Sequence, residues 1–266
     1  MLLENKNAVI YGGGGVIGGA VARAFALEGA RIFLAGRTRA PLEAVAGEIG
    51  HTGGTADVAL VDALDARAVD RHADEVAERA GGIDVSFNAI GIDNGEQAIP
   101  LVELPVEAYL IPVTTYARTH FLTAKAAARH MVERGSGVIL PLSAPMARMP
   151  TALSGSFGIG FAAVECLARQ LAAELGPHGV RVVCLRLDGI PESASLGSHT
   201  RQVWGRAAER LGIGLDRLLE MVGSGGVRGR PLTAAEVAEA AVLAATDRAT
   251  ALTGTVVNLT SGAVLD

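Results

Sequence analysis

The sequence predicts an α/β fold in which one doubly wound parallel sheet carries helices on both faces, and two observations favour it. Short apolar runs alternate with longer helical stretches at the spacing of successive strand–helix units, and the first unit turns through consecutive glycines. The 266 residues are 50% hydrophobic and 19% charged, which is enough apolar material for a large core. We expect a single domain over residues 1–266.

The first strand–helix unit covers residues 7–29. Residues 8–11 form a short apolar run, residues 12–15 are all glycine, and apolar residues from Ile17 to Leu27 recur near the helical period. A strand that turns through glycines into a helix presents unpaired N–H groups at the positive end of the helix dipole. Such a turn suits a phosphate. The alternative interpretation is a tight turn with no ligand.

The other elements follow in order along the chain. Strands are predicted at residues 31–35, 57–61, 83–88, 137–142, 180–185 and 255–259. Helices are predicted at residues 40–50, 65–79, 105–133, 156–175 and 233–246. Thr233 and Glu236 fit a capping box at the start of the last helix. Residues 191–230, which contain Trp204, break this pattern, and we expect them to form a mobile excursion on the substrate side of the sheet edge.

Charge and composition argue against several classes of protein. The net charge is −5 and there is no basic block, so we expect no nucleic-acid partner. With no leader pattern and no apolar run of membrane-spanning length, we expect no membrane contact and a cytoplasmic location. Cys166 and Cys184 lie in apolar surroundings, which predicts two buried thiols. The six histidines show no ligand spacing, so we expect no metal.

Residues that suit a dinucleotide follow three of the predicted strands. Arg37 stands where an acid usually holds the ribose hydroxyls of NAD(H), and its charge suits the 2′-phosphate of NADP(H); the alternative is a solvated surface cation. Asp62 either accepts from the adenine amino group or caps the next helix. Asn88 opens a stretch, residues 88–91, that either approaches the ribose and nicotinamide or ties neighbouring loops together. We expect NADP(H), with NAD(H) less favoured.

These motifs together resemble a known family. Over essentially its whole length the chain is similar to classical-type short-chain dehydrogenases/reductases. Residues 11–18 resemble the family's Thr-Gly-x-x-x-Gly-x-Gly, residues 88–91 its Asn-Asn-Ala-Gly, and residues 253–262 its closing Thr-Gly strand and loop. The resemblance implies a Rossmann fold and the following cofactor-binding residues: Gly12, Gly15, Ile17, Gly18, Arg37, Asp62, Asn88, Ala89, Gly91 and Ile190.

The chain also departs from the family pattern. Val16 replaces the middle glycine of the nucleotide loop and narrows the approach to the pyrophosphate. Residues 187–189, Leu-Asp-Gly, stand where the family usually has Pro-Gly. In the family a Tyr protonates the product alkoxide and a Lys four residues later lowers its pKa. The two lysines of this chain, Lys6 and Lys125, have no Tyr four residues before them.

Alignment with the family's active-site helix places phenylalanines at both of these positions. Phe157 falls at the Tyr position and Phe161 at the Lys position. Ala144 falls at the position of the substrate-orienting Ser, with Ser143 one residue earlier, and Tyr116 falls near the position of the Asn that holds a proton-relay water. None of the family's four catalytic residues, Ser, Tyr, Lys and Asn, is therefore found at its aligned position.

Two interpretations of the function follow. In the first, the protein is an NADP(H)-dependent oxidoreductase with a non-standard active site that reduces an apolar enone or ketone. Tyr116, Ser143 or water supplies the proton, and the enone is slightly favoured because its negative charge delocalises onto a distant oxygen. The pocket is lined by Phe157, Phe161, Met146 and Met149.

In the second interpretation the fold serves something other than hydride transfer. The protein is then a non-redox enzyme such as a cyclase or isomerase, or a non-catalytic nucleotide- or ligand-binding subunit or sensor. The family resemblance further implies a homotetramer built on residues 105–133, residues 156–175 and the C-terminal strand region.

Overall fold

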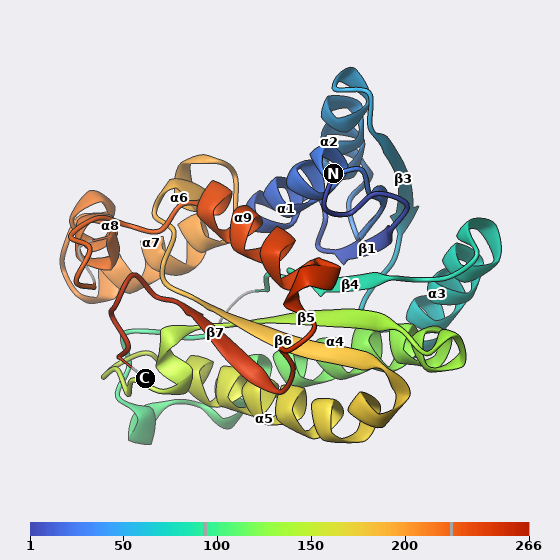
Figure 1. Ribbon diagram of the computed structural model, residues 1–266. Coiled ribbons are helices and arrows are strands. Elements are labelled where there is room, and N and C mark those ends of the chain that lie inside the picture. Colours follow the sequence, from blue (N-terminus) through green and yellow to red (C-terminus); the bar gives the residue numbers. More distant parts are fainter. Residues whose placement is uncertain (93–94, 224–225, 266) are drawn as a thin grey trace.

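The computed structural model describes residues 1–92, 95–223 and 226–265, and its strands form one sheet of seven parallel strands (Figure 1). The strands are β1 (Asn7–Tyr11), β2 (Arg31–Gly36), β3 (Thr55–Leu60), β4 (Val85–Asn88), β5 (Gly137–Ser143), β6 (Val180–Leu187) and β7 (Thr255–Leu259). Their order is β3-β2-β1-β4-β5-β6-β7, so the direction of winding reverses between β1 and β4. Ligands of open α/β sheets bind at this reversal, outside the carboxyl ends of the strands. The predicted fold class is confirmed.

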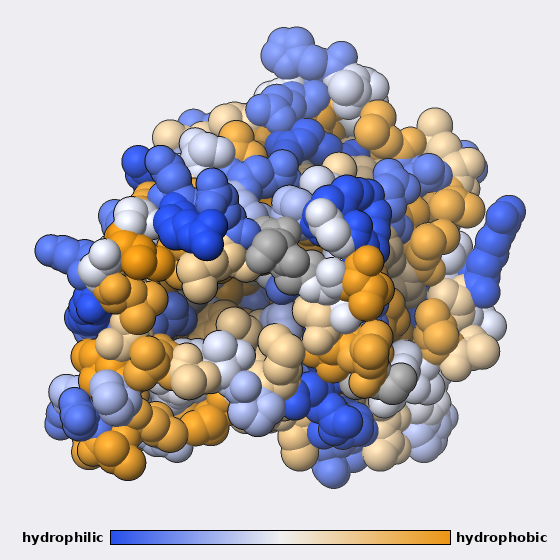
Figure 2. Space-filling model, turned by 90° about the vertical axis from the view of Figure 1, so that its left-hand side faces the viewer, coloured by the Kyte–Doolittle hydropathy of each residue, from blue (hydrophilic) through white to orange (hydrophobic). Residues whose placement is uncertain are grey.

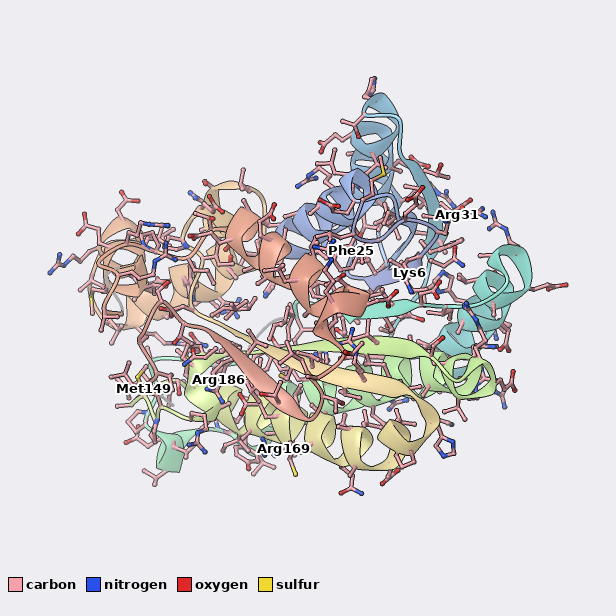
Figure 3. All side chains as sticks on the ribbon, in the orientation of Figure 1. Lys6, Phe25, Arg31, Met149, Arg169 and Arg186 are labelled. Atoms are coloured by element: carbon pink, nitrogen blue, oxygen red, sulfur yellow. The ribbon has the colours of Figure 1, made fainter. Side chains whose placement is uncertain are left out.

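Three longer helices cover each face of the sheet. The first group is α1 (Val16–Leu27), α2 (Arg39–His51) and α9 (Ala234–Ala245), and the second is α3 (Ala66–Ala80), α4 (Val106–Arg134) and α5 (Phe157–Leu175). Because strand side chains alternate between faces, Ile10 of β1 packs with α1 and Val9 packs with α3 and α4. In the first core, Phe25 of α1 meets Phe87 of β4 edge to face, with 6.5 Å between the ring centroids (Figure 3).

The predicted strands and helices named above are confirmed to within two residues at each end. The capping box is also confirmed, since Oγ1 of Thr233 accepts from the N–H of Glu236 at 3.2 Å and the Glu236 carboxylate accepts from the N–H of Thr233 at 3.1 Å. Four 3-10 turns complete the secondary structure of the described residues: Leu101–Glu103, Pro145–Ala147, Gly176–His178 and Asp247–Ala249.

The excursion at residues 191–230 contains three helices, which gather at the left of Figure 1. They are α6 (Glu192–Ser195), α7 (Thr200–Arg210) and α8 (Leu215–Gly223), and residues 224–225 lie outside the described part. Seen from that side, the molecule is hollowed near its centre, with hydrophobic residues beside the hollow (Figure 2). Residues of this excursion line the cavity at the carboxyl ends of the strands.

One cysteine prediction is wrong. Cys184 of β6 is buried, whereas Cys166 of α5 is exposed. The helical period explains the difference, because α5 turns Val164 and Ala168 inward and therefore turns Cys166 toward the outside. Both thiols are free. Among the described residues no helix is both long enough and apolar enough to cross a bilayer.

Candidate functional site

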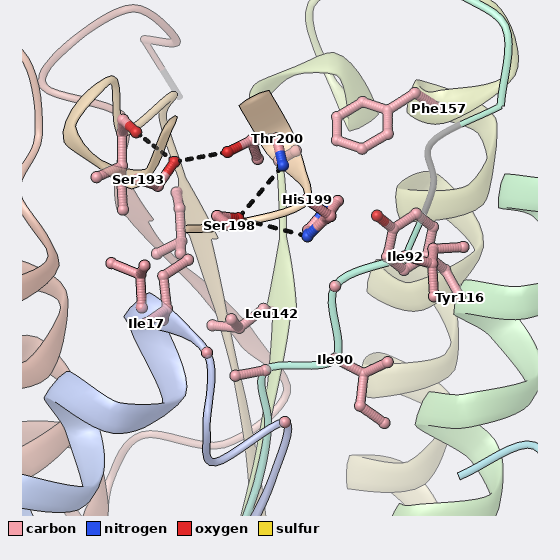
Figure 4. Close-up of a pocket in the computed structure, with 18 of the residues that line it drawn as sticks. Ile17, Ile90, Ile92, Tyr116, Leu142, Phe157, Ser193, Ser198, His199 and Thr200 are labelled. Atoms are coloured by element: carbon pink, nitrogen blue, oxygen red, sulfur yellow. Dashed lines mark hydrogen bonds between the residues drawn. The ribbon is translucent and has the colours of Figure 1, made fainter. Parts of the chain in front are cut away.

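A cavity of about 760 Å³ opens at the carboxyl ends of the strands (Figure 4). Its wall is formed by the ends of β1, β2, β4, β5 and β6, by the first turn of α1, by α4 and α5, and by the helices of the excursion. Ten of the predicted site residues lie on the wall: Gly12, Gly15, Ile17, Arg37, Asp62, Ala89, Gly91, Tyr116, Ser143 and Ile190. Gly18 and Asn88 lie behind it and are buried.

The glycine loop is shaped by close backbone contacts. Gly12 has φ +77°, and a Cβ there would stand 2.5 Å from the carbonyl oxygen of Ala89. A Cβ on Gly18 would stand 2.3 Å from the carbonyl oxygen of Gly12. Both positions therefore require glycine for packing, before any ligand is considered.

The first turn of α1 has no side-chain cap. The N-cap residue is Gly15, and Val16 and Ile17 follow it on the cavity wall. The N–H groups of this turn are therefore open to an anion placed in the cavity. Val16 lies beside them, at the place where the sequence predicts a narrowed approach.

Arg37 lies exposed at the end of β2 and on the cavity wall. Among the described residues it has no hydrogen-bond or ion-pair partner, whereas its neighbour Arg39 pairs with Glu43 at 3.3 Å. Oδ1 of Asp62 accepts from the N–H of Leu64 at 3.0 Å. The helix-cap interpretation of Asp62 is wrong, because α3 is capped by Asp65.

Asn88 connects three segments. Its amide donates to Oγ1 of Thr123 on α4 at 2.9 Å, and its side-chain oxygen accepts from the N–H of Ile90 at 3.0 Å. This geometry matches the interpretation in which Asn88 ties neighbouring loops. It also fixes residues 89–91 against the cavity.

An aromatic cluster forms the other end of the cavity. The ring of Tyr116 lies 4.3 Å from that of Phe161 and 5.9 Å from that of Phe157, measured between centroids, and the two phenylalanine rings are 4.8 Å apart. Gly160 permits this approach of α4 and α5, since a Cβ there would stand 2.8 Å from the carbonyl oxygen of Pro112. Phe157, Phe161, Met146 and Met149 all lie on the wall, so this end of the cavity is apolar.

Ser143, the other predicted catalytic residue, is bound to a buried carboxylate. Its hydroxyl donates to Oε1 of Glu165 at 2.8 Å, and Arg186 donates to both oxygens of the same carboxylate at 2.8 and 3.0 Å. A hydroxyl that donates inward offers the cavity only its lone pairs.

The cavity is also lined by polar residues that the sequence did not single out for the site, and Asp188, His120, His199 and Trp204 are among them. Asp188 follows β6, and burial raises the pKa of its carboxyl. Burial lowers the pKa of His120 to about 4, and its Nδ1 lies 2.9 Å from the carbonyl oxygen of Tyr116. His199 and Trp204 come from the excursion. Two of these residues gave a signal in the sequence: Asp188 lies in the Leu-Asp-Gly departure from the family pattern, and Trp204 is the single tryptophan of the chain.

The residues on the wall fit a dinucleotide. An open helix N-terminus, an unpaired arginine and an apolar end lie along one continuous cavity. The fold and the cavity thus define an α/β protein of the Rossmann type with its crevice at the switch point.

Comparison with known sequences shows the family. A family model described as enoyl-(acyl carrier protein) reductase matches residues 14–263. The chain belongs to the short-chain dehydrogenase/reductase family.

Relatives and solved structures agree with this assignment. The L-rhamnose 1-dehydrogenase (NAD(P)(+)) of Azotobacter vinelandii is 32% identical over 68% of this chain and 72% of its own length. The short-chain reductase protein NovJ of Streptomyces niveus is 29% identical over 97% of this chain and 94% of its own. The matched part covers between 57% and 94% of the length of curated relatives such as these. An actinorhodin polyketide ketoreductase variant solved with NADPH has the same fold, with TM-score 0.85, 24% identity and 97% of each chain covered.

Proposed function

We propose that the protein is an NADP(H)-dependent oxidoreductase that reduces an apolar enone or ketone in an atypical active site. One observation carries the proposal: a single cavity joins the open first turn of α1 and the unpaired Arg37 to the apolar cluster around Phe157. The ketoreductase of the same fold was solved with NADPH, and the L-rhamnose dehydrogenase relative is named for both nicotinamide cofactors. These relatives support a nicotinamide cofactor here.

Residues along the cavity would hold the cofactor. The N–H groups at the start of α1 suit the pyrophosphate, and Arg37 suits a 2′-phosphate. Oδ2 of Asp62 remains able to accept from the adenine amino group, since only Oδ1 takes the N–H of Leu64. Gly91 and Ile190 line the same cavity, and we assign them to its nicotinamide end. When bound, the reduced nicotinamide supplies a hydride.

The apolar end of the cavity favours a substrate without charge. Phe157, Phe161, Met146 and Met149 exclude water from the reacting carbon and orient the substrate by shape. An enone needs less help from an acid than a ketone does, because its charge spreads to a distant oxygen. For this reason we favour enone reduction slightly over ketone reduction.

The active site is proposed as atypical because its polar groups differ from the family pattern. Phenylalanines 157 and 161 stand at the positions aligned with the family's Tyr and Lys, and Ser143 donates to Glu165 instead of to the cavity. The sequence predicted two proton donors, Tyr116 and Ser143. Tyr116 lines the cavity, whereas the hydroxyl proton of Ser143 is donated to Glu165.

A cofactor titration tests the proposal. Purified protein is titrated with NADPH and with NADH, and the nicotinamide fluorescence is followed. We expect tighter binding of NADPH, lost in a Gly18→Trp variant whose side chain would meet the backbone of Gly12. Apolar enones and ketones are then screened for loss of absorbance of the reduced nicotinamide. No binding of either cofactor at millimolar concentration overturns the proposal.

The second candidate is a non-redox enzyme or a non-catalytic binding protein. The observation that favours it is the enclosure of Tyr116 between Phe157 and Phe161, together with the inward hydrogen bond of Ser143. Such a site binds by shape without moving a proton. Binding of NADPH with no consumption across the whole substrate panel would favour this candidate.

We further propose that the chain forms a single domain and that it assembles as a homotetramer through α4, α5 and the C-terminal strand region. Phe121 of α4 is 46% exposed and Ile159 of α5 is 41% exposed, so both helices carry large apolar side chains on the surface. Light scattering coupled to gel filtration measures the mass in solution. A monomer at micromolar concentration would contradict this assembly.

A further inference from the structure

His199 reaches across the cavity from the excursion to the opposite wall. It directly precedes α7, and its ring packs on the backbone of Gly91 after β4. A Cβ on Gly91 would stand 2.2 Å from Cε1 and 2.6 Å from Nδ1 of the ring. Figure 4 shows the imidazole on the same side as Ile92, Tyr116 and Phe157. The imidazole thus lies on the cavity wall, and its Nδ1 is 3.4 Å from Oγ of Ser198.

Local hydrogen bonds fix the segment that presents this ring. Oγ of Ser193 donates to the carbonyl oxygen of Ile190 at 2.6 Å and lies 2.9 Å from Oγ1 of Thr200. The N–H of Ser198 donates to the carbonyl oxygen of Ser193 at 3.1 Å, and the N–H of Thr200 donates to Oγ of Ser198 at 3.3 Å. His199 lies between these anchored residues, so the backbone holds it over the cavity.

The contact gives Gly91 a role in addition to the one predicted from sequence. Any side chain there would displace the imidazole, because the ring occupies the space of a Cβ. The absence of a side chain at this position therefore positions His199 as well as leaving room for a cofactor.

The other titratable groups on the wall are less suited to protonate a substrate at this end. Burial keeps His120 neutral, since it lowers the pKa of that imidazole to about 4. Tyr116 is enclosed by two phenylalanine rings. Burial raises the pKa of the Asp188 carboxyl, but the N–H of Gly189 donates to its Oδ1 at 2.7 Å and thereby stabilises the carboxylate, the form without a proton to give. Arg37 and Asp62 lie near the ends of β2 and β3, away from the aromatic cluster.

We propose that His199 is the catalytic proton donor, a residue that contacts the carbonyl oxygen of the substrate. This inference rests on the proposed reduction of an enone or ketone. As the electrophilic carbon gains the hydride, the π electron pair moves to the oxygen. The imidazolium N–H bond breaks, its proton bonds to that oxygen, and the electron pair stays on the ring nitrogen. A proton taken up from the bulk solvent then restores the imidazolium, so each reduction consumes one solvent proton.

The test compares His199→Gln with a matched control, His178→Gln. His178 is exposed in the turn after α5, far from the cavity wall. In protein labelled with ¹⁵N-histidine, the imidazole signal that disappears in His199→Gln belongs to His199. We expect this signal to move when NADPH is added and the His178 signal to stay in place. In Gly91→Ala the His199 signal should differ from wild type before any ligand is added.

Turnover supplies the second measurement. We expect His199→Gln to lower NADPH consumption about 10²- to 10⁴-fold, as loss of a general acid does, with the NADPH dissociation constant changed by less than about 3-fold. Added imidazole should restore part of the rate in His199→Ala, which a purely structural role would not allow.

The outcomes separate this inference from the proposed function. Equal turnover in wild type and His199→Gln overturns the role of His199 and leaves the reductase assignment standing. If NADPH binds and the His199 signal does not move, the role of His199 is overturned as well. Failure of wild type to bind NADPH overturns the proposed function, and this inference with it.

Discussion

The hydroxyl of Ser143 donates a 2.8 Å hydrogen bond to Oε1 of Glu165, which links the end of β5 to the helix that bears the aromatic cluster. Arg186, the register partner of Ser143 on β6, holds the same carboxylate through two nitrogens (Figure 3). Each of the three residues is 3% exposed. A buried carboxylate needs such partners, because it has lost its hydration.

Removal of this carboxylate should destabilise the protein strongly. We expect Glu165→Ala to lower the free energy of unfolding by about 3–5 kcal/mol, because Arg186 is left charged in the core. Ser143→Ala should lower the free energy of unfolding by about 1 kcal/mol, since the Glu165 carboxylate keeps its hydrogen bonds to Arg186. Urea unfolding followed by circular dichroism measures both. The control is Glu174→Ala on the exposed part of α5, and an equal loss in the control would contradict the prediction.

The sequence predicted the sheet well because its strands are continuous apolar runs between glycines and helices. Residues 8–11 of β1, for example, read Ala-Val-Ile-Tyr and are all buried, as expected for a strand at the centre of a parallel sheet. Thr233 and Glu236 fixed a helix start to the residue because a capping box is a local interaction. Cys166 was misassigned because an apolar neighbourhood in the sequence does not say which side of a helix faces out.

The sequence could predict residues of the candidate site only where they belong to a recognisable local motif. The glycine loop and Arg37 follow from local sequence, and the structure places both on one cavity. His199 has no motif, and its contact with Gly91 joins residues 108 positions apart. The contact between Ser143 and Glu165 likewise depends on how α5 packs on β5, which no local pattern encodes.

Trp204 should report cofactor binding. It is the single tryptophan of the chain and lies on the cavity wall. Reduced nicotinamide absorbs where tryptophan emits, so we expect NADPH to quench the emission of Trp204 and to gain sensitised emission of its own. A Trp204→Phe variant should bind NADPH by nicotinamide fluorescence and lack the sensitised signal. Unchanged tryptophan emission at saturating NADPH would contradict the placement of the cofactor in this cavity.

Arg37 should set the preference between the two cofactors. A charge-assisted hydrogen bond to the 2′-phosphate exists only with NADPH, so Arg37→Ser should weaken NADPH binding roughly 10- to 100-fold and leave NADH binding nearly unchanged. Arg39→Ser is the matched control, because that side chain pairs with Glu43. Calorimetric titration gives the four dissociation constants. If Arg37→Ser weakens the binding of NADPH and NADH equally, Arg37 does not set the preference between the two cofactors.

Alanine substitution at two helical glycines should change the free energy of unfolding in opposite directions. Gly18→Ala puts a methyl group 2.3 Å from the carbonyl oxygen of Gly12, so we expect a loss of about 1–3 kcal/mol in the free energy of unfolding. Gly47→Ala on α2 meets nothing within 4 Å and should stabilise the protein by roughly 0.5–1 kcal/mol. Thermal and urea unfolding check both. Stabilisation by Gly18→Ala would show that the loop relaxes around the methyl group.

Two buried imidazoles should make the protein sensitive to acid. Burial lowers the pKa of His72 and of His120 to about 4, from an ordinary value of 6.5. Nδ1 of His72 and Nε2 of His120 have no hydrogen-bond partner among the described residues, so protonation inside the core would be uncompensated. Between these pKa values the unfolded chain binds more protons than the folded protein. The stabilisation is therefore complete above pH 6.5 and is lost as the pH falls toward 4.

The expected loss at about pH 5 is roughly 2 kcal/mol for each imidazole, relative to about pH 7.5. Urea unfolding at the two pH values measures it. A His72→Leu, His120→Leu double variant should lose most of this pH dependence, because neither site then binds a proton in the unfolded chain. His178→Leu, at an exposed position, should keep it. If the double variant retains the full pH dependence, carboxylates and not these imidazoles govern acid unfolding.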